Sequence, residues 1–68
     1  MKAARVSVET RVIVVTGWKV GNVLNDAGIR AVYVGTVKGW MVDRHNLGNV
    51  LAVLDRAGYD AQVSEVAA

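Results

Sequence analysis

The chain of 68 residues contains no cysteine, no proline and no phenylalanine, and it has a single histidine. Without cysteine it forms no disulfide and no thiolate metal site, and one histidine excludes an all-histidine metal site within one chain. No apolar run approaches the ~20 residues that cross a membrane, and the N-terminus lacks the apolar segment of a signal peptide. We therefore expect a cytoplasmic protein with no membrane contact, no metal and no other cofactor.

Runs of like charge are also missing. The net charge is +2, from eight basic and six acidic residues, and no two basic residues are adjacent. A small imbalance of this kind is typical of a mixed, solvated surface and not of a nucleic-acid-binding tract.

What the chain does have is apolar residues, at 53% of the total, including 15 valines. The length predicts one domain over residues 1–68, with residues 1–3 and 66–68 frayed. A chain this short buries only about 60% of the surface that its unfolded form exposes, and small domains often gain stability by oligomerising. We therefore expect a homodimer. The excess of valine over isoleucine and of arginine over lysine is typical of a GC-rich genome, such as that of an actinobacterium or one of its phages.

An imperfect internal repeat divides the chain into two halves. Gly17-Trp18 recurs at residues 39–40, Gly21-Asn22-Val23-Leu24 recurs at residues 48–51, and Ala27-Gly28 recurs at residues 57–58. Each half has apolar residues at helical spacing between two β-rich stretches. The repeat predicts two strand–helix–strand units.

The periodicity predicts the elements in more detail. Strands are expected over residues 4–15, 29–36, 40–43 and 61–66, and helices over residues 20–27 and 47–57. Thr16 and Asp43 are expected to cap the two helices, and Gly28 and Gly58 to end them in the left-handed conformation. Lys38-Gly39 predicts a hairpin, and the polar alternation of residues 61–66 predicts a strand at the edge of the sheet.

This order predicts an α+β fold of the ferredoxin-like type, βαββαβ. The expected sheet has four antiparallel strands in the order 4-1-3-2, with both helices on one face.

Strand alternation assigns side chains to the two faces of this sheet. On the helix-covered face we expect Val6, Val8, Val12, Val14, Val32, Val34, Val42, Ala61 and Val63. On the open face we expect Arg11, Ile13, Tyr33, Met41, Gln62 and Ser64. The first strand is longer than its partners, so residues 5–9 either pair with a second chain or follow a bend near Glu9-Thr10.

Few residues of the sequence are placed for catalysis. His45 follows Asp43 at the start of the second helix, and the carboxylates Asp26, Asp43, Asp55 and Asp60 all occupy helix ends or turns. Ser7 and Ser64 lie on strands with no partner for nucleophilic catalysis. We predict that the protein is not an enzyme.

The open sheet face and the tryptophans point instead to binding. Trp18 falls off the apolar stripe of its helix, whereas Trp40 is expected to cover the edge of the core. The leading hypothesis is a small interaction module, such as a phage or mobile-element accessory protein that modulates a host protein. Its expected protein contacts are Ile13, Trp18, Tyr33 and Met41.

Two alternatives stay open. The same sheet face could bind nucleic acid through Arg5, Arg11, Lys38 and Arg44. Residues 42–51 resemble the strand–loop–helix segment of ACT regulatory domains, which implies small-molecule sensing at a dimer interface.

Overall fold

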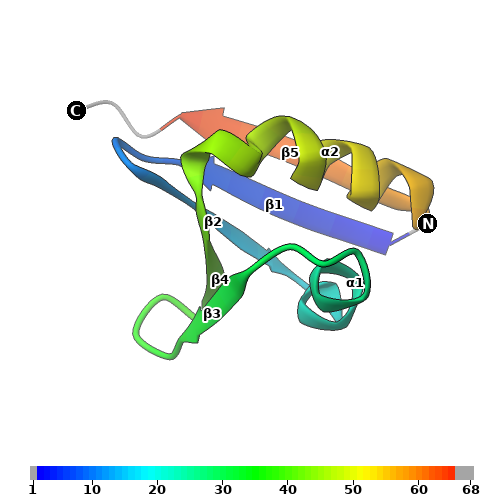
Figure 1. Cartoon of the computed structure of the whole chain (residues 1–68), viewed down its shortest axis with the longest axis horizontal. Coiled ribbons are helices and arrows are strands. Elements are labelled where there is room, and N and C mark those ends of the chain that lie inside the picture. Colours follow the sequence, from blue (N-terminus) through cyan, green and yellow to red (C-terminus); the bar gives the residue numbers. More distant parts are fainter. Residues whose placement is uncertain (1, 66–68) are drawn as a thin grey trace.

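A five-stranded mixed β-sheet carries two helices on one of its faces (Figure 1). The computed structural model describes residues 2–65. Its elements are β1 (Lys2–Val8), β2 (Val12–Gly17), α1 (Val20–Asp26), β3 (Ala31–Val34), β4 (Gly39–Asp43), the 3₁₀ turn η1 (Arg44–Asn46), α2 (Leu47–Arg56) and β5 (Tyr59–Glu65). The strand order is β3-β4-β2-β1-β5, in which β1 and β5 are parallel and all other neighbours are antiparallel.

The prediction of a four-stranded, antiparallel, ferredoxin-like sheet in the order 4-1-3-2 is wrong. The stretch expected as one long strand is a hairpin of β1 and β2, in which the Glu9 N–H donates to the Val12 carbonyl oxygen at 2.9 Å. Strand β1 inserts between β2 and β5, so the sheet has a fifth strand and one parallel pair. Of the two alternatives for residues 5–9, pairing with a second chain is wrong, because residues 4–8 are paired on both sides within the chain. The bend near Glu9-Thr10 lies where the chain reverses between β1 and β2.

The hairpin also reverses part of the expected division between the two faces. Val6 pairs with Val15 and Val8 pairs with Ile13, so even-numbered residues of β1 share a face with odd-numbered residues of β2. A single strand would have kept one parity throughout. The helix-covered face was predicted correctly for Val6, Val8, Val42, Ala61 and Val63, and wrongly for Val12, Val14, Val32 and Val34.

The open face was likewise predicted only in part. Met41, Gln62 and Ser64 lie on it, as expected. Ile13 is fully buried under the helices, Tyr33 shares the helix-covered face with Trp40, and Arg11 lies in the turn between β1 and β2.

The core lies between the helices and the sheet. Both helices contribute as their apolar spacing predicts: Val20 and Leu24 from α1, and Val50 and Leu54 from α2, are fully buried. They meet the alternating residues Ala4, Val6 and Val8 of β1 and Ile13 and Val15 of β2. None of the described residues of this core is polar or charged. Burial of apolar surface therefore holds the two layers together.

The predicted C-terminal stops of the helices are correct, whereas one of the two predicted N-terminal caps is not. Gly28 and Gly58 have φ of 77° and 86°, which confirms the predicted left-handed stops after both helices. The predicted cap at Thr16 is wrong, because Thr16 belongs to β2 and Lys19, itself left-handed, precedes α1 without a side-chain cap. Asp43 caps the turn η1 by accepting from the His45 N–H at 3.2 Å.

Gly21, the second residue of α1, permits close packing of the helix on the sheet. A Cβ atom placed on it would lie 2.2 Å from Cζ2 of Trp40, whose other neighbour is the Tyr33 ring in an edge-on contact at 5.4 Å. Gly48 is the second residue of α2 and the repeat counterpart of Gly21, but a Cβ there would meet no atom within 4 Å. The two glycines therefore have different roles despite their matching sequence context.

We predict that Gly21→Ala lowers the free energy of unfolding by about 1–3 kcal/mol, because the Trp40 indole must move out of a packed position. The matched substitution Gly48→Ala should leave it unchanged or raise it by up to ~1 kcal/mol, since alanine is the better helix former. Urea denaturation followed by circular dichroism measures both. Equal effects at the two positions would contradict the packing role of Gly21.

Candidate functional site

The face of the sheet that carries no helix is apolar over three of its strands. Val32, Met41 and Val14 form one row across β3, β4 and β2, and the same row continues through Ser7 and Ser64 on β1 and β5. We call the apolar half of this face the valine patch; its members are Val12, Val14, Val32, Val34 and Met41. The other half is polar, so the face is divided along the boundary between β2 and β1.

Within the valine patch, exposure rises toward the edge strand. Val14 is only 7% exposed, since its side chain and that of Thr16 fold over the bare backbone of Gly39. Val32, on the edge strand β3, is 60% exposed. A contiguous apolar area of this kind is typical of an interaction surface.

The four predicted protein contacts do not gather at one place. Ile13 belongs to the core and Met41 to the valine patch. Tyr33, 54% exposed, lies on the opposite face of β3 from Val32. Trp18 is 67% exposed, as predicted, at the far end of β2, where Lys19 Nζ lies 4.5 Å from its ring centroid and the Tyr59 hydroxyl donates to its carbonyl oxygen at 2.6 Å.

The four predicted nucleic-acid contacts form two separate pairs. Arg11 and Arg44 line one concavity, beside the β1–β2 turn. Arg5 lies next to Thr16 on the open face, and Lys38 precedes Gly39 at that same end of the sheet. The Arg44 guanidinium is already occupied, because it donates to the carbonyl oxygens of Glu9 and Thr10 at 3.3 and 3.2 Å. The described arrangement therefore offers no continuous basic surface.

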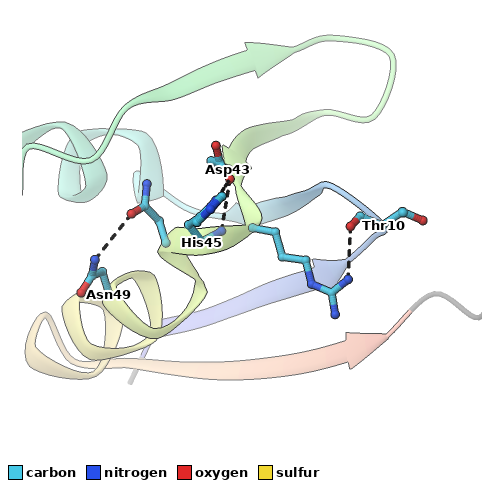
Figure 2. A network of polar contacts seen from close by, with 6 residues as sticks. Thr10, Asp43, His45 and Asn49 are labelled. Atoms are coloured by element: carbon cyan, nitrogen blue, oxygen red, sulfur yellow. Dashed lines mark hydrogen bonds and ion pairs between the residues drawn. The ribbon is translucent and has the colours of Figure 1, made fainter.

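The segment that joins β4 to α2 brings together two titratable groups, Asp43 and His45. His45 Nδ1 and Asp43 Oδ1 lie 2.6 Å apart, and Figure 2 shows His45 facing Asp43 with Thr10 and Asn49 on opposite sides of the pair. The hydrogen bond to Asp43 raises the pKa of His45 above its ordinary value of 6.5, and the same bond lowers the pKa of Asp43. Both side chains are largely exposed, so the pair is a solvated contact beside a concavity of about 540 Å³.

A second concavity was not anticipated from the sequence. It has a volume of about 480 Å³ and lies between α1 and the beginning of β3. We call it the α1–β3 cleft; its lining residues are Gly21, Asn22, Asn25, Gly28, Ile29, Arg30, Ala31 and Trp40. The sequence signal for it was the pair of asparagines on the polar side of α1, three residues apart, but only the strand order places that side next to an edge strand.

Residues 2–65 hold no group of three histidine or acidic side chains placed to bind a metal ion. Over the same range, no helix is long and apolar enough to span a bilayer. The expected cytoplasmic location, phage or actinobacterial origin and homodimer stay predictions, because no described contact bears on them.

The Asp43–His45 pair should be visible in a pH titration. We predict that the pKa of His45, measured from its ring proton shifts by NMR, lies above 6.5 and falls back toward 6.5 in Asp43→Asn, which keeps the oxygen that caps η1. The pair stabilises the fold fully at pH values between the pKa of Asp43 and the pKa of His45 in the unfolded chain. That contribution is lost as His45 deprotonates at higher pH or as Asp43 protonates at lower pH. An unchanged His45 pKa in the variant would contradict the contact.

Comparison with models of known protein families, with curated proteins and with solved structures found no match for this chain. Residues 42–51, which carry the ACT resemblance, form the end of β4, the turn η1 and the first half of α2, but the sheet order β3-β4-β2-β1-β5 is not the expected ferredoxin-like order. Function is therefore inferred from the two surfaces described above, the valine patch and the α1–β3 cleft.

Proposed function

We propose that the protein is a small, non-catalytic interaction module that self-associates into a homodimer through the valine patch. The observation that carries the proposal is the row of Val32, Met41 and Val14 on a face that no described helix covers. Burying this row in a partner removes apolar surface from water, which is the main driving force for association.

A second copy of the chain is the partner that best suits this surface. None of the five residues of the valine patch is charged, and the two charged residues that line a groove with Val12, Val32 and Met41, Arg30 and Asp43, have opposite signs. Two patches related by a two-fold axis can therefore meet without an excess of like charge. Two sheets can stack face to face at a spacing of about 10 Å, with their side chains interleaved. Asp43 borders the patch beside Val12, and Arg5 and Asp60 lie farther along the same face, so charges of both signs surround the apolar centre, as is common at the rim of an interface.

The size of the patch indicates a weak dimer. A standard interface takes ~800 Å² from each partner, which is about a sixth of the accessible surface of 4751 Å². The valine patch has five residues, against about 20–30 on each side of a standard interface, so we expect dissociation constants in the micromolar range or above.

The absence of an assembled catalytic group supports the non-catalytic part of the proposal. Among residues 2–65 the single ion pair is His45–Asp43, and both of its side chains are open to water. Catalytic acids and bases are usually placed where burial or neighbouring charges tune them and water is excluded. The expected sensing of small molecules and binding of nucleic acid have no comparable observation in their favour.

Sedimentation velocity at tens to hundreds of micromolar tests the dimer. We predict a concentration-dependent rise above the 7.3 kDa monomer, and its loss in Val32→Lys, because a lysine ammonium cannot be buried between two apolar sheets. Val63→Lys is the matched control: Val63 is also an exposed valine on an edge strand, but it lies on the helix-covered face of β5.

Two outcomes would overturn the proposal. One is a monomer of 7.3 kDa at every concentration. The other is a dimer that Val63→Lys disrupts and Val32→Lys leaves intact, because that result would place the interface on the other face.

A further inference from the structure

Strand β3 presents an unpaired edge beside the α1–β3 cleft. Because β3 is the first strand in the order β3-β4-β2-β1-β5, only one side of its backbone bonds to a neighbour in the described chain. A free edge of this kind presents N–H and C=O groups that can pair with an added strand. Ala31, the first residue of β3, also lines the cleft, so a segment paired with this edge would lie at the mouth of the cleft.

The other edge of the sheet is less suited to pairing. Strand β5 has α2 packed beside it and carries the acidic residues Asp60 and Glu65. Charged residues on an edge strand discourage the addition of a further strand. Strand β3 itself carries no charge, as it consists of Ala31, Val32, Tyr33 and Val34.

The lining of the α1–β3 cleft combines amides with one positive charge. Asn22 and Asn25 are exposed on α1, and Arg30 is the sole charged residue in the lining. Arg30 has no ion-pair partner within residues 2–65; the nearby groove that it lines with Asp43 does not supply one, since the Asp43 carboxylate binds His45. An arginine fork and two amide N–H donors are the groups that bind a carboxylate best.

Basic residues flank both ends of the edge strand. Arg30 immediately precedes β3, and Lys38 lies in the turn that follows it, in the left-handed conformation at φ 51°. No acidic residue occurs between Asp26 and Asp43 along the chain. Residues 27–42 therefore carry two positive charges and no negative charge, which favours an acidic partner.

We propose that the α1–β3 cleft binds an extended, acidic peptide segment of a partner protein, which pairs with β3 as an added strand and places a glutamate or aspartate side chain in the cleft against Arg30, Asn22 and Asn25. Trp40 forms the apolar wall of the cleft, where it packs on Gly21. The inference goes beyond self-association: it concerns a different surface and a different partner, and either proposal can fail alone.

The test uses capped pentapeptides Thr-Val-X-Val-Thr, in which X is Glu, Gln or Lys, titrated to millimolar concentration into isotope-labelled protein. We expect NMR shift changes centred on the amides of Ala31–Val34 and the side-chain amides of Asn22 and Asn25. The Glu peptide should bind about five- to tenfold more tightly than the Gln peptide, and the Lys peptide more weakly still. In Arg30→Gln the preference for Glu over Gln should disappear, whereas Arg56→Gln, which removes the same charge from α2, should keep it.

Main-chain pairing is tested by N-methylation of the Glu peptide at alternate residues. Successive N–H groups of a paired strand point to opposite sides, so one of the two alternating N-methylated peptides should lose binding and the other should keep it. The proposal is overturned by an absence of shifts at millimolar peptide, by shifts centred on β5 or on Val12, Val14 and Met41, by equal affinity for the Glu and Lys peptides, or by binding of both N-methylated peptides.

Discussion

The reversal of the chain at Thr10–Arg11 is the constraint on which the rest of the structure depends. It converts a continuous apolar alternation into two antiparallel strands and places β1 between β2 and β5, where residues 4–8 have a partner on both sides. The turn is held from outside by one residue: the Arg44 side chain donates to the carbonyl oxygens of Glu9 and Thr10, and its backbone N–H donates to the Arg11 carbonyl oxygen at 3.2 Å. The same residue begins η1 and so links the hairpin to the start of α2.

Local signals in the sequence were sufficient for the helices, their glycine stops, the β3–β4 hairpin and the position of the last strand at an edge. Each of these depends on a few neighbouring residues, such as Gly28 and Gly58 at the helix ends. The β1–β2 turn has no such signal, because Glu9-Thr10-Arg11-Val12 contains no glycine, asparagine, aspartate or proline. When residues 4–15 are treated as one strand, the parity of β2 is inverted, and Ile13 is assigned to solvent although it is fully buried.

The internal repeat matches the structure when the two halves are aligned at a spacing of thirty residues. The buried pair Val20 and Leu24 corresponds to Val50 and Leu54, each thirty residues later, and the stops Gly28 and Gly58 keep this spacing. The Gly-Asn-Val-Leu match has a spacing of twenty-seven residues, so it aligns residues that are equally far from the helix starts but differ in burial: Leu24 is fully buried, whereas Leu51 is partly buried. Helix α2 has 10 residues and α1 has 7, which accounts for the difference between the two spacings. Gly21 meets Trp40, whereas Gly48 faces open space.

Strand β3 belongs to both proposed surfaces, and its alternation keeps them apart. Val32 points to the valine patch, whereas Ala31 lines the α1–β3 cleft on the other face.

A peptide strand added to β3 would extend the sheet by one strand, and every second side chain of that peptide would lie beside Val32 and Val34. An apolar residue at those positions would enlarge the valine patch and increase the surface buried in a homodimer. Peptide binding and self-association would then be thermodynamically linked, and the factor by which one strengthens the other must be the same in both directions. The edge strand, with only four residues, is thus the element through which the two surfaces would be coupled.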